Sequence, residues 1–114
     1  MNSPTKINIA KNFSIVPLGR YPTDSAYNGE TFRNKILLPA LKKNTPIEIN
    51  LDGVDGYGSS FLEESFGGLV RECNYSAEDL LKRFTFISNE DPTLIEEIHH
   101  YIVSAGILKS GNKK

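Results

Sequence analysis

Two adjacent serines in the run YGSSFLEE, residues 57–64, are the residues of this sequence best placed to do chemistry. Ser60 and Glu63 have the Ser-x-x-Glu spacing of a capping box, in which each side chain accepts a hydrogen bond from the other residue's backbone N–H. Ser59 is left outside that box, at the positive end of the predicted helix. A phosphate on Ser59 would place nearly two negative charges beside unpaired N–H groups. Ser59 is therefore our candidate for phosphorylation, and the alternative is a turn serine bonded to local backbone.

A catalytic role for Ser59 would need a base and an orienting third group. The only histidines, His99 and His100, lie near the C-terminal end, and the pattern Gly-x-Ser-x-Gly is absent. Glu96, His99 and His100 could offer two metal ligands on one helix face, but a solvated face explains them as well. We predict neither an enzyme nor a metal site.

The remaining reactive side chains have ordinary explanations. Cys73 lies on an apolar helical stripe and is expected to be a buried small hydrophobe. Acidic residues surround the turn and would suit acid–base chemistry or Mg²⁺, but acids favoured by a helix dipole are the common case: Asp52, Asp55, Glu63 and Glu64. No phosphate-binding loop, dinucleotide fingerprint or zinc pattern is present, so no cofactor is predicted.

A second hypothesis uses two arginines. Arg20 lies in a long loop, residues 19–29, and Arg33 follows on the next predicted helix. A guanidinium group matches the geometry of phosphate well. Arg20 and Arg33, with the backbone of residues 58–60, could then hold a small anion or a nucleotide. The alternative is that Arg33 pairs with an acid and Arg20 is solvated.

The elements that would position these residues follow from the hydrophobic period. Residues 47–51 alternate apolar and polar side chains, which predicts a strand, and from Ser60 onward a stripe of apolar residues predicts a helix. Upstream, residues 6–10 and 13–18 predict a β-hairpin. Asn28 is the expected N-cap of a helix over residues 29–43. In this helix Pro39 predicts either a kink or an end near Leu38 followed by a short second turn.

Downstream, Ser76 is the expected cap of a short helix, and residues 83–87 predict a strand. Asp91 and Pro92 predict the start of a last helix, with Gly106 as its C-cap. The order predicts an α/β fold, a mixed sheet of about four strands with helices packed against it and residues 47–51 in its interior.

Size and charge restrict the class of protein. The chain has 114 residues and a net charge of −1, which indicates one domain over residues 1–108 and a basic disordered tail over residues 109–114. The balance of charges predicts neither a nucleic-acid nor a membrane partner. One cysteine and no long apolar run indicate a soluble cytoplasmic protein.

The stretch NLDGVDGYGSSFLEESFGGL resembles the STAS-like domains of unknown function found in bacteria, in which an acidic-glycine-valine turn leads into a Ser-Phe-x-Asp/Glu-Glu helix start. The similarity extends upstream through Gly19-Arg20 and residues 28–33. This family is distantly similar to the STAS domains of anti-sigma-factor antagonists, small α/β proteins in which a strand runs into a helix at an Asp-Ser-Ser-Gly turn.

In those antagonists a partner kinase of the histidine-kinase-like ATPase superfamily phosphorylates the first serine, and the phosphate prevents binding to that partner. That turn corresponds to residues 58–61 of this chain, so the switch serine would be Ser59, while Gly58 replaces the aspartate and Phe61 the glycine. The resemblance thus implies a non-enzymatic regulatory or protein-interaction module with a protein partner. The partner-binding residues that it implies are Gly58, Ser59, Ser60, Phe61 and Glu64. A structural domain of a larger assembly is a further alternative.

Overall fold

The computed structural model describes residues 3–111 and contains a three-stranded parallel sheet. Its strands are β1 (Thr5–Asn8), β2 (Ile47–Asn50) and β3 (Phe84–Ile87), in the order β1-β2-β3. Ile7, Ile49 and Phe86 are paired across the sheet. The α/β class and the interior position of β2 are as predicted, but the described residues form three parallel strands rather than a mixed sheet of about four.

The missing strand is the second half of the predicted hairpin. After β1 the chain forms a single helical turn, α1 (Ile9–Asn12), because the side chain of Asn8 accepts a hydrogen bond from the Lys11 N–H and caps the turn. Phe13 then packs against Phe32, with ring centroids 5.1 Å apart. Residues 13–18, which were predicted to form a strand, instead place Phe13 in an aromatic contact and begin a long loop.

The first crossover is one continuous helical run of α2 (Gly29–Phe32), the π-helical turn η1 (Arg33–Leu37) and α3 (Leu38–Leu41). Asn28 is its N-cap, as predicted, and accepts from the Thr31 N–H at 2.9 Å. Pro39 is the second residue of α3, with only Leu38 between it and the π turn. A proline cannot donate to the carbonyl one turn earlier, and the wider π turn accommodates that missing bond.

The second crossover is built in the same way, from α4 (Ser59–Leu62), the π turn η2 (Glu63–Gly67) and α5 (Gly68–Arg71). It is followed by α6 (Ala77–Arg83), capped by the Ser76 hydroxyl, which accepts from the Asp79 N–H as predicted.

The last helix, α7 (Thr93–Gly111), begins just after Asp91, whose carboxylate accepts from the Thr93 N–H. The prediction that Gly106 ends this helix is wrong. A side chain at Gly106 would lie 3.1 Å from Ala77 Cβ, so Gly106 allows α7 to cross α6 closely. Residues 109–111, expected to belong to a disordered tail, are helical, and residues 112–114 of that prediction lie outside the described residues.

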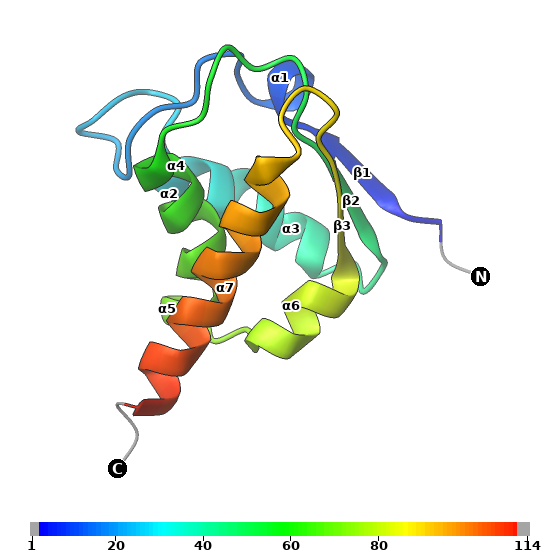
Figure 1. Cartoon of the computed structure of the whole chain (residues 1–114), viewed down its shortest axis with the longest axis vertical. Helices are drawn as coiled ribbons and strands as arrows, with labels where there is room; N and C mark the ends of the chain where they lie inside the picture. Colours follow the sequence, from blue (N-terminus) through cyan, green and yellow to red (C-terminus); the bar gives the residue numbers. More distant parts are fainter. Residues whose placement is uncertain (1–2, 112–114) are drawn as a thin grey trace.

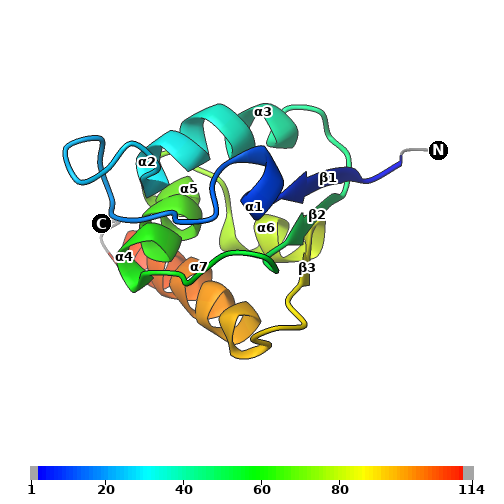
Figure 2. The ribbon, with the colours of Figure 1, turned by 90° about the horizontal axis from the view of Figure 1, so that it is seen from above.

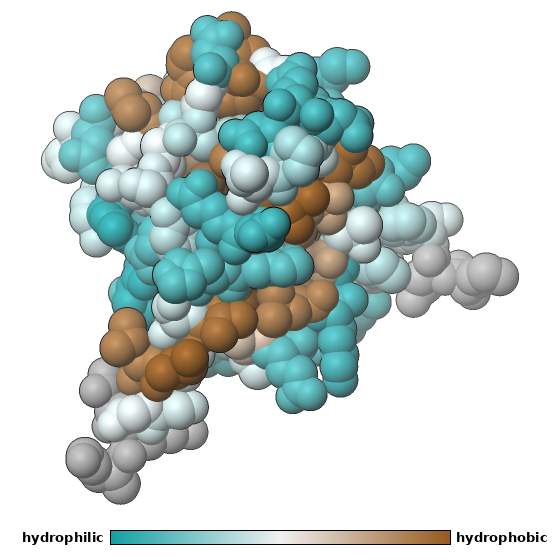
Figure 3. All heavy atoms as spheres, viewed as in Figure 1, coloured by the Kyte–Doolittle hydropathy of each residue, from teal (hydrophilic) through white to brown (hydrophobic). Residues whose placement is uncertain are grey.

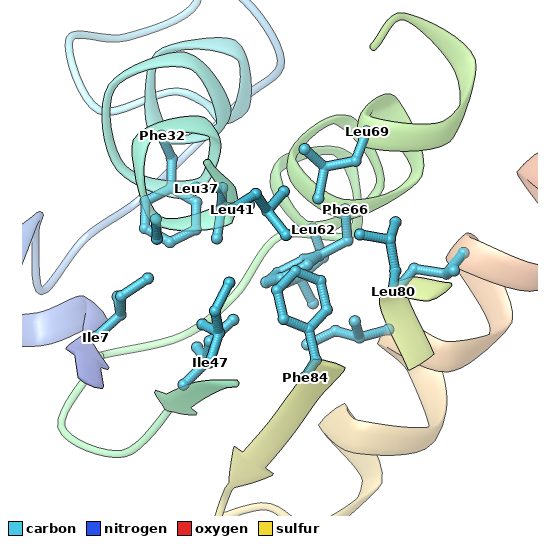
Figure 4. Close-up of a cluster of buried hydrophobic side chains, with 14 of the residues drawn as sticks. Ile7, Phe32, Leu37, Leu41, Ile47, Leu62, Phe66, Leu69, Leu80 and Phe84 are labelled. Atoms are coloured by element: carbon cyan, nitrogen blue, oxygen red, sulfur yellow. The ribbon is translucent and has the colours of Figure 1, made fainter. Parts of the chain in front are cut away.

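The helices cover one face of the sheet, as Figures 1 and 2 show. Side chains from that face meet those of the two crossovers and α6 in a single core, drawn in Figure 4. The opposite face carries Lys6, Glu48 and Thr85, none of which is buried. Among residues 3–111, no helix is long and apolar enough to cross a membrane.

Candidate functional site

Ser59 lies on the surface at the first position of the second crossover helix. The N-cap is Gly58, which has an extended backbone and no side chain to cap the helix, and Leu62 N–H donates to Gly58 O. The N–H groups of the first turn, before Leu62, therefore have no partner within the helix. Ser59 and Ser60 are both exposed.

The predicted capping box between Ser60 and Glu63 is not formed. The N-cap is Gly58, two residues before the expected cap, so Ser60 is inside the first turn of the helix. The Glu63 carboxylate turns to two arginines, Arg20 and Arg71. An ion pair with charge-assisted hydrogen bonds outweighs a neutral cap contact here. Ser59 lies at the N-terminal, positive end of this helix, as predicted.

The side chain of Ser59 lies beside Tyr101 of α7. The Tyr101 phenol donates to Glu97 Oε2 at 2.6 Å. Burial and the Glu97 carboxylate together raise the pKa of Tyr101 to about 12, while the nearby Ser59 hydroxyl acts in the opposite direction. A group added to the Ser59 hydroxyl would therefore adjoin both the helix N–H groups and a carboxylate of α7.

Two of the predicted partner-binding residues are not accessible. Phe61 is fully buried, with an exposed fraction of 0%, and stacks between Tyr57 and Phe13 at centroid distances of 6.2 and 6.1 Å. Glu64, in the π turn that continues the same helical run, is also buried. The expectation that these side chains lie on a binding surface is corrected: the aromatic cluster and an internal ion pair hold them in the core.

Five charged side chains form what we call the Arg–Glu network, made of Arg20, Arg33, Glu63, Glu64 and Arg71. Arg33 Nη1 lies 2.7 Å from Glu64 Oε2 and also donates to the backbone O of Glu64 at 2.9 Å. This pair is buried, with side-chain exposed fractions of 6% for Arg33 and 3% for Glu64. It joins the two π turns, η1 and η2, across the interface between the crossovers.

The outer part of the Arg–Glu network reaches the surface. Glu63 bridges Arg20 at 2.5 Å and Arg71 at 2.6 Å, and both arginines also reach Glu64 Oε1. Burial acts to raise the pKa of Glu63, but the hydrogen bonds from Arg71 and Arg20 outweigh it and hold that pKa below its ordinary value of 4.5.

The anion-binding hypothesis is left without geometric support. Arg20 and Arg33 do converge, but on the carboxylates of Glu63 and Glu64, so the guanidinium groups that would hold a phosphate beside Ser59 are engaged in internal ion pairs. Arg33 Nε is buried and has no hydrogen-bond partner among the described residues.

Sequence reasoning missed Arg71 and the glycine pair Gly67-Gly68. A side chain at Gly67 would meet the Glu63 carboxylate, and one at Gly68 would collide with the guanidinium of Arg33. Two adjacent glycines inside a predicted helix carry a cost in stability, and such a pair indicates close packing against the helix. That signal could have located the partner of Arg33.

The other candidates do not form a site. His99 and His100 are exposed on α7, where the His100 ring lies 3.5 Å from the Ser104 hydroxyl. Cys73, expected to be buried, is only partly so. Within residues 3–111 there is no group of His, Cys, Asp or Glu that could hold a metal ion.

An apolar surface adjoins Ser59. The loop between α1 and α2 exposes most of the large apolar side chains that the structure leaves uncovered, and Figure 3 shows brown atoms gathered over the loops at the top of the molecule. They are Ile15, Val16, Leu18, Tyr21 and Tyr27. The loop is held to the next strand-to-helix connection by a hydrogen bond from the Asp55 N–H to the Ile15 O. Sequence reasoning assigned part of this segment to a strand and so did not identify the surface.

Comparison with known proteins gives one match. The family model described as "STAS-like domain of unknown function" matches residues 28–94, which contain both crossovers, β2, β3 and the whole Arg–Glu network except Arg20. No curated protein and no solved structure matches the chain. Because the model covers more than half of the sequence and includes Ser59 and the strand-to-helix turn, the chain belongs to the family of STAS-like domains of unknown function.

Proposed function

We propose that this chain is a non-enzymatic regulatory module that binds a protein partner through the surface around Ser59, in the cytoplasm. The observation that carries the proposal is the position of Ser59: exposed, at the first residue of the helix after the central strand, and next to uncovered apolar side chains. Exposed apolar patches on small domains commonly mark interaction surfaces. Of the predicted partner-binding residues, Gly58, Ser59 and Ser60 remain accessible, and we assign the decisive contact to Ser59 and treat the Ser60 hydroxyl as dispensable.

We further propose that a partner ATPase of the histidine-kinase-like superfamily phosphorylates Ser59 and so switches binding. The unpaired N–H groups of the first helical turn would donate hydrogen bonds to the phosphate oxygens. Glu97, bonded to Tyr101 beside Ser59, would repel it. A phosphate there would thus compete with the Tyr101–Glu97 hydrogen bond, so the modification would change the contacts of α7.

A pull-down from the native host tests the module, with wild type, Ser59→Asp, Ser59→Ala and Ser60→Ala as baits. Ser60 is the matched control, because it is also exposed and lies one residue further along the same turn. We expect a protein retained by wild type and by Ser60→Ala but recovered in a different amount by Ser59→Asp. Equal recovery of every protein by all baits would show that Ser59 is only a turn residue.

Phosphate transfer is tested separately by incubating wild type with the recovered ATPase and labelled ATP. Incorporation should be lost in Ser59→Ala and retained in Ser60→Ala. Incorporation that persists in Ser59→Ala would place the modification elsewhere.

A further inference from the structure

The exposed apolar loop forms a ridge directly beside the segment that leads to Ser59. Ile15, Val16 and Leu18 have exposed fractions of 53%, 53% and 58%. Ile15 is hydrogen-bonded through its backbone to Asp55, and Leu18 Cδ1 lies 4.0 Å from where a side chain on Gly58 would begin. We call these three side chains the apolar ridge. It follows one side of the segment 55–58.

An acidic pocket lies on the other side of the same segment. It has a volume of about 270 Å³ and opens at the carboxyl ends of β2 and β3, where open parallel sheets commonly bind their ligands. Its carboxylates belong to Asp52, Asp55, Glu90, Asp91 and Glu97. Tyr57, which forms part of the wall, donates to the backbone O of Leu51, and burial followed by the charges of nearby acids raises its pKa.

These carboxylates are not neutralised by the part of the chain that the structure describes. None of the ion pairs within residues 3–111 includes any of them. Asp52 accepts from the backbone N–H groups of Asn89 and Glu90, which orients it without adding positive charge. Lys11, an exposed cation on α1, also takes part in none of these ion pairs, so it forms no ion pair with the acidic pocket. The arginines of the Arg–Glu network are committed elsewhere.

We propose that the apolar ridge and the acidic pocket together bind a cationic amphipathic segment of a protein partner. Its apolar residues would pack on the ridge, and its Lys or Arg side chains would enter the pocket. This inference rests on the proposed function and names the chemistry of its partner. Nucleic acids and anionic membranes are disfavoured, because both would bring phosphate toward unneutralised carboxylates.

The test uses a synthetic helical peptide of leucine and lysine with one apolar and one basic face, labelled and titrated into the full chain. We expect micromolar binding that weakens about tenfold between low and high salt, since screening acts on the charged half of the contact. Two control peptides, with glutamate for lysine and with serine for leucine, should bind at least about tenfold more weakly.

Variants locate the contact. Asp55→Lys combined with Glu90→Lys should weaken binding of the leucine–lysine peptide at least about tenfold. Glu72→Lys combined with Glu78→Lys is the matched control, because it changes net charge equally on side chains that lie away from the pocket. That control should leave the affinity within about twofold. Leu18→Ser should also weaken binding, and circular dichroism establishes that each variant is folded.

Three results would overturn the inference: no binding of the leucine–lysine peptide up to millimolar concentration, equally tight binding of the glutamate peptide, or equal losses in the two double variants. If any of these occurs while the pull-down still depends on Ser59, the cationic partner is wrong and the proposed function stands. If the pull-down also shows no dependence on Ser59, both fail.

Discussion

Replacing Glu64 by glutamine should remove much of the stability of this domain. The change keeps the size and shape of the side chain and removes its charge, so Arg33 is left buried without a counter-ion. The side chains of Arg33 and Glu64 are only 6% and 3% exposed, and their closest atoms are 2.7 Å apart. Removing one partner of such a pair costs about 3–5 kcal/mol. The total free energy of unfolding of a natural domain is about 5–15 kcal/mol.

Urea unfolding followed by circular dichroism near neutral pH measures the effect. With a slope of about 1.5 kcal/mol per molar urea, the midpoint of Glu64→Gln should fall by about 2–3 M. The control is Glu72→Gln, because the Glu72 side chain is 55% exposed and its carboxylate lies 3.4 Å from Arg71 Nε. That substitution should change the free energy of unfolding by less than about 0.5 kcal/mol.

A double variant separates charge from shape. Arg33→Met with Glu64→Leu removes both charges and fills the space with apolar atoms, so it should recover most of the stability lost in Glu64→Gln. A cost below about 1 kcal/mol for Glu64→Gln would refute the view that the Arg–Glu network holds the crossovers together. A double variant as unstable as Glu64→Gln would refute the electrostatic explanation.

Three further predictions follow from the structure. Folding lowers the pKa of Glu63 below its ordinary value of 4.5. Its contribution to stability is therefore complete above pH 4.5 and is lost as the pH falls through the pKa of the folded state. Glu63→Gln lacks this contribution, so it should lose less stability on acidification than wild type in urea titrations. A methyl group on Gly29 would lie 2.8 Å from the Phe61 carbonyl, so Gly29→Ala should destabilise by about 1–3 kcal/mol in thermal unfolding, whereas Gly56→Ala, in open space, should not. The pKa of Tyr101 is raised to about 12, so Tyr101→Phe should remove one late tyrosine from an alkaline absorbance titration, and an unchanged titration would contradict its environment.

Local patterns in the sequence predicted much of the fold. Asn28 and Ser76 cap their helices as expected, because capping depends on residues within one turn. The alternation of apolar and polar residues in β2, also a local pattern, correctly predicted a strand. The prediction of a hairpin was wrong because Asn8 caps a helical turn and Phe13 packs on Phe32, which is distant in sequence. The hydrophobic periodicity of a segment does not show such contacts.

The place of Ser59 at the start of a helix was predicted, but the contacts around it were not. Ser59 is exposed at the helix start, as its place before the apolar stripe indicated. Ser60 was assigned to a capping box with Glu63, because local spacing cannot reveal that Arg20, far away in sequence, competes for that carboxylate. For the same reason the sequence could not show that Phe61 faces the core.

The central claim is that the surface at Ser59 meets a protein partner. Site-specific photo-crosslinking in the native host tests it most directly, with a benzoylphenylalanine placed at Ser59 and, as control, at Thr85 on the polar open face of the sheet. We predict a discrete protein adduct from position 59 and none from position 85. Adducts from position 85 together with none from position 59 would contradict the claim.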